Sequence, residues 1–256
     1  MIDARAAIDP AARLAPGVSV GPWTIIGADV EIGEGTWIGP HTVIKGPTRI
    51  GRNNKIFQFS SVGDDPQDKK YAGQTTHLEI GDGNVFRECC TVNRGTLEGG
   101  GVTRVGDHNW IMAYCHIAHD CQVGNQTIFA NNASLAGHVT VGDYAILGGF
   151  SGVHQFVSVG AHSFLGMGSL LGRDLPPYVM AAGPEAHPHG LNTEGLRRRG
   201  FGAETLQTLR RAYKILYRQN LTLAQALERL RELAEGCPEL GVMVAFLERS
   251  ERGIVR

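Results

Sequence analysis

Residues 117–140 read IAHDCQ VGNQTI FANNAS LAGHVT, four six-residue units that each begin with a large apolar residue. The same period extends outward, with apolar residues every six positions over Ile2–Val62, Ile80–Val92 and Val105–Leu171. Glycine often follows the apolar residue, and a small residue often stands four places after it. A period of six fits short strands joined by tight corners, rather than a helix or one long strand.

Three such units make a triangular coil of eighteen residues, and coils can stack by pairing their strands about 4.8 Å apart. The apolar residue then points into a narrow core, the small residue fits beside a corner, and glycine supplies unusual dihedral angles there. The sequence therefore predicts a mainly β fold, a parallel β-helix of hexapeptide repeats. Cys90, Cys115 and Cys121 occupy the small-residue position, so we expect core filling rather than reactive thiols.

The repeat is interrupted by loops near 63–79 and 95–104, the second containing three consecutive glycines. We predict a β-helix over 1–177, an irregular linker over 178–200 after two prolines, and a small C-terminal α-helical domain over 201–256.

About three helices are expected in that domain. Thr222 to Gln225 reads as a capping box, and Pro238 suits a first helical turn. One apolar stripe at helical spacing comprises Leu206, Leu209, Tyr213 and Leu216.

Composition excludes several classes of protein. The 256 residues carry a formal net charge of −1, which gives no global attraction to nucleic acid or to an anionic membrane. No apolar run approaches the roughly 18 residues of a transmembrane helix. The five cysteines are an odd number without a disulfide-like spacing, so a reducing, cytoplasmic compartment is expected.

The six residues from His116 to Cys121 hold two histidines and an aspartate, which the repeat does not require. With eighteen residues per coil, His119 stacks on Gly137 and Asp120 stacks on His138. An imidazole beside a residue without a side chain suggests a general base with a backbone oxyanion donor, as acyl transfer to a hydroxyl needs. No serine or cysteine is placed as a nucleophile, so direct transfer is favoured.

Other interpretations remain open at this point. His116, His119 and His138 are three histidines, the number that holds zinc in β-helical carbonic anhydrases. A purely structural solenoid is also compatible with the repeat. A basic cluster near the start of the helical domain is either a solvated face or a dock for anionic groups. It comprises Arg197, Arg198, Arg199, Arg210, Arg211, Lys214 and Arg218.

Several motifs resemble, over essentially the full length, the UDP-N-acetylglucosamine O-acyltransferases that start lipid A biosynthesis. They are Ile8–Pro10, Gln67–Gly73, Arg94–Thr96, His116–Cys121, Ala130–Ala133, Leu135–Val139, Val153–Phe156, Pro176–Val179 and Gly195–Phe201. The resemblance implies a left-handed β-helix, a homotrimer with active sites between subunits, and transfer of a 3-hydroxyacyl chain from acyl carrier protein to the sugar 3-hydroxyl. It implies no metal and no cofactor other than the phosphopantetheine of the carrier protein.

The resemblance also implies residue roles. His119 matches the general base, Asp120 its neighbour and Gly137 the oxyanion donor. Residues that match substrate-contacting positions are Asp68, Lys70, His116, His138 and Gln155, with Asn192, Glu194, Arg198 and Arg199 at the nucleotide end.

Two positions depart from part of the family. Asn93 stands where some members have histidine, and Met167 stands where long-chain members have glycine. Met167 is therefore expected as an acyl-chain ruler that favours a medium chain of the 3-hydroxydecanoyl class.

The sister N-acyltransferase of the pathway is the nearest alternative, but it generally carries an additional N-terminal domain, and here the repeat starts at Ile2. The motifs do not distinguish a 3-hydroxyl from a 3-amino sugar.

Overall fold

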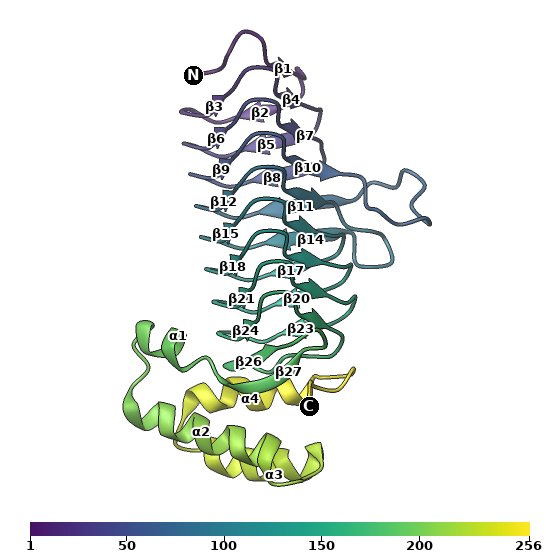
Figure 1. Cartoon of the computed structure of the whole chain (residues 1–256). Helices are drawn as coiled ribbons and strands as arrows, with labels where there is room; N and C mark the ends of the chain where they lie inside the picture. The colour runs from purple at the N-terminus through teal and green to yellow at the C-terminus, as the bar shows by residue number, and fades with distance from the viewer.

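The computed structural model describes residues 1–256. Its main body is a triangular prism made of three sheets, which we call sheets I, II and III. The chain passes from sheet I to sheet II to sheet III and back again, and each turn of three strands stacks on the one before (Figure 1). The predicted parallel β-helix of hexapeptide repeats with a C-terminal helical domain is confirmed.

Most strands have only two residues because each crosses one narrow face between corners. Sheet I contains β1 (Ala7–Ile8), β4 (Ile25–Ile26), β7 (Val43–Ile44), β10 (Ser61–Asp64), β13 (Thr91–Asn93), β16 (His116–Ile117), β19 (Ser134–Leu135), β22 (Gly152–Val153) and β25 (Leu170–Leu171). Sheet II contains β2 (Arg13–Leu14), β5 (Val30–Ile32), β8 (Thr48–Ile50), β11 (His77–Ile80), β14 (Val102–Val105), β17 (Gln122–Val123), β20 (Thr140–Val141) and β23 (Ser158–Val159). Sheet III contains β3 (Ser19–Val20), β6 (Trp37–Ile38), β9 (Lys55–Ile56), β12 (Val85–Phe86), β15 (Trp110–Ile111), β18 (Ile128–Phe129), β21 (Ile146–Leu147), β24 (Phe164–Leu165), β26 (Val179–Ala182) and β27 (His187–Leu191).

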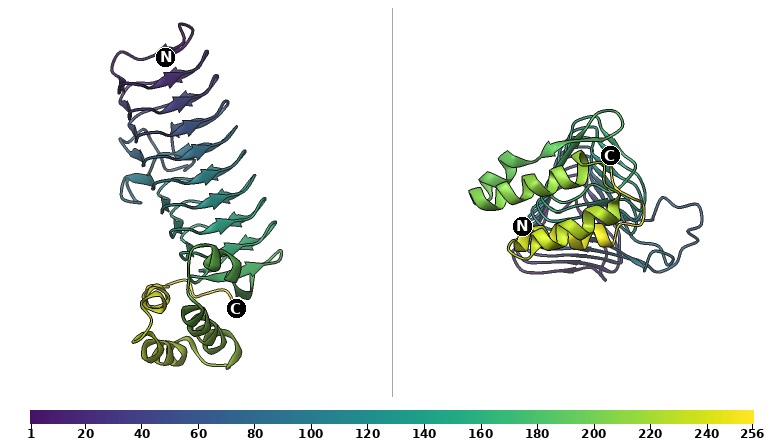
Figure 2. Two further views of the ribbon diagram at one scale, coloured as in Figure 1. Left: turned by 90° about the vertical axis from the view of Figure 1, so that its left-hand side faces the viewer. Right: turned by 90° about the horizontal axis from the view of Figure 1, so that it is seen from below.

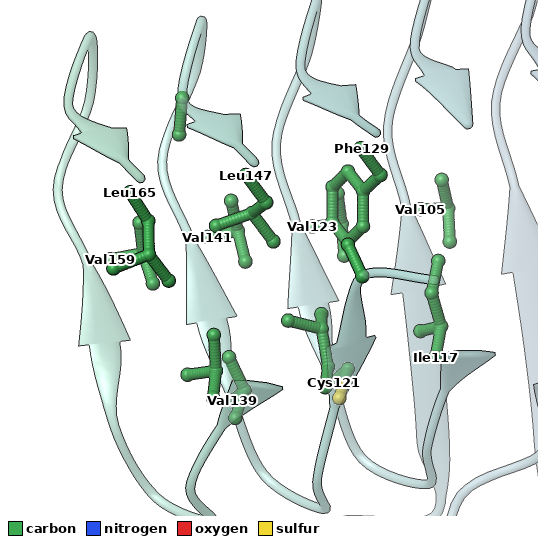
Figure 3. Packing of buried hydrophobic residues seen from close by; sticks show 14 of the residues in the cluster. Val105, Ile117, Cys121, Val123, Phe129, Val139, Val141, Leu147, Val159 and Leu165 are labelled. Carbon is green, nitrogen blue, oxygen red and sulfur yellow. The ribbon is translucent and has the colours of Figure 1, made fainter. Parts of the chain in front are cut away.

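The core follows the predicted register. Ile117 pairs with Leu135, and Leu135 pairs with Val153, each eighteen residues further along the chain. Their side chains and those of the other repeat-initial residues from Val20 to Leu171 are almost completely buried. Figure 3 shows labelled members of these columns, such as Ile117, Val123 and Leu147, inside the prism. Burying a side chain of this size stabilises the fold by about 1.5–3 kcal/mol, so the stacked columns are the main source of stability.

Several repeat glycines have a different role from the one expected. Gly21 and Gly33 do not adopt positive φ. An ideal Cβ on Gly33 would lie 2.6 Å from the carbonyl carbon of Gly51 in the next coil. These glycines are therefore needed for the close approach of neighbouring coils, not for their dihedral angles.

The left-handed residue of each corner is the third after the apolar residue and is often large. His41 (φ +55°), Phe59 (φ +62°) and Asp120 (φ +61°) are examples. The following small residue is buried, and Thr24 Oγ1 donates there to the carbonyl of Gly39 at 2.7 Å. The thiols of Cys90, Cys115 and Cys121 donate in the same way, as expected for core filling.

Both loops leave the prism at the same edge, between sheet I and sheet II (Figure 1). The first joins β10 to β11 over 65–76, and the second joins β13 to β14 over 94–101. They lie on consecutive coils, directly before the coil that carries His119. The insertions therefore build up one edge of the prism beside the predicted catalytic stretch.

The outer surfaces of the three sheets differ. Sheet II carries an in-register row of alternating charges, Arg13, Glu31, Arg49, Glu79 and Arg104. Sheet III carries a largely apolar row, Trp37, Val85, Trp110, Ile128, Ile146 and Phe164, which is interrupted by Lys55 between Trp37 and Val85. At the edge between sheets III and I, the side chains of Trp23, Phe59, Tyr114 and Phe150 are 55–62% exposed. Sheet II thus suits solvent, whereas sheet III and its edge with sheet I form an uncovered apolar surface.

The segment 178–200, expected as an irregular linker, is largely ordered into regular structure. Strand β26 continues sheet III in parallel with β24, and β27 pairs antiparallel with β26. Helix α1 (Thr193–Arg198) follows. Pro176 and Pro177 do not stop the sheet because they lie before β26, at the corner, where no strand N–H is required.

The C-terminal domain contains α2 (Ala203–Arg218), α3 (Leu223–Ala234) and α4 (Pro238–Glu248), which lie across the end of the prism (Figure 2). The predicted stripe on α2 is buried, the capping box of Thr222 and Gln225 is present, and Pro238 begins α4. The tail returns to the last coil, where Val255 N donates to the Asp174 carbonyl at 2.9 Å. None of the helices is long and apolar enough to cross a membrane.

An aromatic stack fastens α1 to the edge between sheets II and III. The ring of His162 stacks on Tyr144 with centroids 4.7 Å apart, and Phe201 meets its edge at 5.1 Å. Burial, reinforced by the nearby Arg199 cation and opposed by Asp143, lowers the pKa of His162 from 6.5 to about 4. His162 is therefore neutral in the folded protein at pH 5, whereas it is protonated in the unfolded chain.

We expect the protein to lose stability as the pH falls from about 6.5 toward 4, because protons then bind the unfolded chain preferentially. In His162→Phe this component of the loss should disappear. Phenylalanine tolerates the corner, since Phe59 and Phe150 adopt similar positive φ in this chain. Melting temperatures of both proteins at pH 7.5 and 5.0 give the measurement. An equal decrease in both would show that His162 does not carry this dependence.

Candidate active site

The turn between β16 and β17 presents His119 at the edge between sheets I and II. His119 Nδ1 lies 2.8 Å from Asp120 Oδ2, and the His119 side chain is 13% exposed. A carboxylate accepts only, so this hydrogen bond places the proton of the neutral ring on Nδ1. Nε2 is then left with a free lone pair that can accept a proton.

Asp120 is held from several directions. Its carboxylate is fully buried, and it accepts from Thr96 N at 2.8 Å and from Thr96 Oγ1 at 2.7 Å. Its own N–H donates to Thr103 Oγ1 at 2.8 Å. A buried carboxylate needs such donors, because an unpaired charge away from water is strongly unfavourable.

Gly137 lies against the ring of His119, as the eighteen-residue register predicted. An ideal Cβ on Gly137 would stand 2.5 Å from His119 Cε1 and 2.7 Å from Nε2. Only glycine fits beside the ring in this position. The Gly137 N–H donates to no backbone or side-chain acceptor, so it is available to a bound oxygen.

His138 and Phe156 extend the same edge by two coils. The His138 ring meets that of His119 edge to face at 5.2 Å and stacks on Phe156 at 4.4 Å. His138 Nε2 lies 3.6 Å from Asp120 Oδ2, so the predicted proximity of these two residues is confirmed. Gln155 lies beside them and is exposed.

His116 is close to this group but has its own partner. Its Nδ1 lies 2.7 Å from Thr91 Oγ1 on the neighbouring strand. Burial, with a smaller contribution from His119, lowers the pKa of His116 and keeps the ring neutral near pH 7. A neutral ring can hydrogen-bond a sugar or acyl group without adding charge.

The three histidines of the zinc alternative are not the group that the fold brings together. The grouping that could hold a metal is His119, Asp120 and His138, without His116. Nδ1 of His119 is already used for the hydrogen bond to Asp120, and both oxygens of Asp120 accept from Thr96. This donor set therefore fits a hydrogen-bonded pair better than a zinc site.

The cysteines nearby are poor nucleophiles. Burial raises the pKa of the Cys121 thiol to about 12 and that of Cys115 to about 11. Almost none of either thiol is ionised near neutral pH, and only the thiolate attacks. A covalent acyl-enzyme on these residues is disfavoured.

Asp68 and Lys70 lie on the first loop, at the same edge as His119. Lys70 Nζ donates to Glu98 Oε2 of the second loop at 3.0 Å, and Lys70 N donates to Asp68 Oδ1 at 3.0 Å. Asn93 Nδ2 donates to the Asp65 carbonyl at 2.8 Å, which gives this position a role in holding the loop.

The four residues expected at the nucleotide end lie elsewhere. Asn192 Nδ2 donates to the His162 carbonyl at 3.0 Å, and the Arg199 guanidinium lies 5.1 Å from the centroid of Tyr144. Glu194 and Arg198 pair with each other on α1. All four therefore belong to the edge between sheets II and III, not to the edge of His119. One chain does not bring them together with the base.

An open groove of about 470 Å³ runs over the outer face of sheet I from His116 past Ser134 and Gly152 to Leu170. Met167 precedes Leu170 at the edge between sheets III and I, and its side chain is 77% exposed. It follows His119 by 48 residues, which at about 4.8 Å per eighteen-residue coil is roughly 13 Å along the prism.

Sequence reasoning missed Thr96 and Thr91, which contact Asp120 and His116. Thr91 could have been found, because Thr91 of β13 pairs with His116 of β16 on the next coil. Thr96 lies in an insertion, where the register gives no prediction. Gly99, one of the three consecutive glycines of that insertion, is also close to the site, because an ideal Cβ there would lie 2.0 Å from Asp120 Cγ. The second loop is therefore a close cover over that carboxylate.

Comparison with known proteins gives the same architecture. The family model described as "Udp N-acetylglucosamine O-acyltransferase; Domain 2" matches residues 174–255. The model described as "Bacterial transferase hexapeptide (six repeats)" matches residues 29–56 and 103–137.

Whole-chain relatives are closer still. A Thiobacillus denitrificans protein named acyl-[acyl-carrier-protein]--UDP-N-acetylglucosamine O-acyltransferase is 60% identical, over 100% of this chain and 99% of its own length. A protein of the same name from Stutzerimonas stutzeri is 57% identical, over 100% and 99%. A Francisella novicida UDP-N-acetylglucosamine acyltransferase structure superposes with a TM-score of 0.98 at 43% identity, covering 100% of this chain and 94% of its own.

An Acinetobacter baumannii structure of the same family also gives a TM-score of 0.98, at 49% identity and covering 100% and 99% of the two chains. Superposition at this level requires the same hand of winding, so the β-helix is left-handed, as expected. Because identity and coverage both extend over the whole length, the chain belongs to the UDP-N-acetylglucosamine O-acyltransferase family.

Proposed function

We propose that this protein transfers a 3-hydroxyacyl chain from acyl carrier protein to the 3-hydroxyl of UDP-N-acetylglucosamine, as the first step of lipid A biosynthesis. The observation that carries the proposal is the corner at which Nε2 of His119 is free and faces Gly137, while Nδ1 is held by Asp120. This arrangement supplies a base and an oxyanion donor at one edge of the prism, from two successive coils.

The reaction proceeds as a direct transfer. His119 Nε2 takes the proton of the sugar 3-hydroxyl as its oxygen attacks the thioester carbonyl carbon. The Gly137 N–H donates to the oxygen that becomes negative. When the tetrahedral intermediate collapses, the carbon–sulfur bond breaks, and His119 returns its proton to the departing phosphopantetheine thiolate. Asp120 stays ionised and keeps the ring in the required tautomer.

The working assembly is a homotrimer of parallel prisms. Its support is the uncovered apolar surface of sheet III and of the edge with sheet I, which a monomer would leave in water. Packing sheet III of one copy against sheet I of the next uses both surfaces. Repeated head to tail around an axis, this contact closes into a ring and leaves the charged rows of sheet II outside.

The same arrangement explains why the site residues lie on two edges. When sheet III of one copy packs on sheet I of the next, the outer edges of those two sheets meet. The edge between sheets II and III, which carries Asn192, Glu194, Arg198 and Arg199, then lies next to the His119 edge of the neighbour. The nucleotide end is thus contributed by one subunit and the base by another, with Asp68, Lys70, His116, His138 and Gln155 beside the base.

The acyl chain extends over sheet I in the groove from His116 toward Leu170. Met167 lies at its far side, so it limits the length that the groove accepts.

Acyl carrier protein is expected to be acidic and to dock on α2. Arg210, Arg211, Lys214 and Arg218 are exposed there. Arg197 and Arg198, by contrast, pair with Glu194 on α1.

The deciding experiment is mass spectrometry of the product formed from UDP-N-acetylglucosamine with a series of 3-hydroxyacyl carrier proteins. An ester-linked acyl group on the 3-oxygen is the expected product. Acylation only of an amino sugar would instead identify the sister N-acyltransferase. Stoichiometric zinc with hydratase activity and no acyl transfer would identify the carbonic anhydrase-like alternative.

His119→Ala should lower kcat by about 10²–10⁴-fold, because a positioned general base contributes that much. The melting temperature should change little, since the core columns are untouched. Wild-type turnover in the His119 variant would contradict the proposed mechanism.

The double variant Arg210→Glu/Arg211→Glu should raise KM for the acylated carrier protein and leave KM for the sugar nucleotide unchanged. Added salt should raise the same KM in the wild type, because the Debye length is only about 8 Å at physiological ionic strength. The matched variant Arg210→Lys/Arg211→Lys keeps the charge and should behave as wild type. Insensitivity to both charge reversal and salt would place the dock elsewhere.

Met167→Gly should shift preference from a 3-hydroxydecanoyl toward a 3-hydroxymyristoyl donor. Excluding three or four methylenes from the groove costs about 2.5–3 kcal/mol, so selectivity should change on the order of a hundredfold. Met167→Leu keeps the bulk and should keep the chain length, and KM for the sugar nucleotide should not move. Competition between the two donors gives the ratio, and an unchanged ratio means that Met167 is not the ruler.

A further inference from the structure

We propose that Thr96 is a positioning residue for the acyl transfer, which fixes the Asp120 carboxylate so that Asp120 can hold His119. This inference rests on the proposed function, because it concerns the orientation of the base. Thr96 donates to the carboxylate with both of its donors, the N–H to Oδ1 at 2.8 Å and the hydroxyl to Oδ2 at 2.7 Å. These two bonds fix the plane of the carboxylate.

The orientation matters because Asp120 itself sits next to His119 in a tight corner. Its φ is +61°, and its side chain has to turn back to reach His119 Nδ1 at 2.8 Å. Oδ2 receives both the Thr96 hydroxyl and the His119 ring. Without the hydroxyl, Oδ2 is free to move toward His138 Nε2, which lies only 3.6 Å away. The Thr96 hydroxyl therefore favours the partnership with His119.

Thr96 is itself held rigidly. Its residue is buried, and its carbonyl accepts from Gly99 N at 3.1 Å and from Gly101 N at 2.7 Å. The adjacent Arg94 is buried and donates to the Gly63 carbonyl and to Tyr71 Oη, with an ion pair to Asp65. The second loop therefore brings its donors to Asp120 from an anchored backbone, and Gly99 allows it to close over the carboxylate.

This anchoring also links two parts of the proposed site. Asn93 and Arg94 hydrogen-bond to the first loop, which carries Asp68 and Lys70. Thr96, two residues after Arg94, hydrogen-bonds to Asp120. The short segment 93–96 thus connects the loop expected to contact substrate with the group that orients the base.

Thr96→Val removes the hydroxyl and keeps the N–H and the side-chain shape. Its kcat should fall about 10–100-fold, as expected for the loss of a hydrogen bond to a charged group, with KM for both substrates within about threefold of wild type. Thr96→Ser retains the hydroxyl and should restore kcat to within about threefold. Thr96→Ala makes the same comparison if the valine variant does not fold.

The control is Thr42→Val, which removes another buried hydroxyl, one that donates to the Phe57 carbonyl on a different edge. It should lower the melting temperature without lowering kcat. A second measurement uses Asp120→Asn as the background. If Thr96 acts through Asp120, adding Thr96→Val there should lower kcat by less than about threefold.

The proposal is overturned if Thr96→Val retains kcat, if the serine variant is as impaired as the valine variant, or if the full loss persists in the Asp120→Asn background. Failure of the proposed function looks different. In that case the wild-type protein forms no acylated sugar nucleotide, whereas failure of this inference alone leaves wild-type transfer intact and independent of the Thr96 hydroxyl.

Discussion

Main-chain hydrogen bonds between successive coils set the position of nearly every residue in the prism. Where the repeat is unbroken, each residue lies beside the one eighteen positions later, as Ile117 does beside Leu135. Short strands could slip against one another, but a slip of one residue would turn the buried columns outward and expose the core. The apolar columns therefore fix the register. The register in turn fixes the position of each side chain that faces outward.

The proposed catalytic corner is a product of this register. His119 and Gly137 are eighteen residues apart, and the backbone spacing of the coils brings the ring against the glycine without any dedicated contact. The prism also supplies rigidity, because a corner enclosed by coils on both sides cannot move independently. What the repeat does not supply is a partner for a buried carboxylate. The chain provides it by an insertion, and the second loop brings Thr96 to Asp120.

The three faces and three edges have separate tasks. Sheet II, with its alternating charges, suits solvent, and the row of opposite charges lies in register along it. Sheet III and its edge with sheet I are apolar, which favours association with further copies. The edges on either side of that contact carry the two halves of the proposed site. In the proposed trimer, association would complete the site as well as cover the apolar surface, so activity and assembly would be linked through one interface.

The sequence by itself determined the repeat, the core residues, the register from Val105 to Leu171, and hence the proximity of His119 to Gly137 and of Asp120 to His138. These follow from periodicity, because in a regular solenoid each residue contacts only its own coil and the two neighbouring coils. Periodicity could not give the contacts of the two insertions, the order in 178–191, or the reason for the repeat glycines, which is close approach between coils. It also left open a zinc site of three histidines that included His116, whereas Thr91 holds that ring. Only the tertiary structure decided these, because the length of an insertion does not specify where its side chains return to the prism.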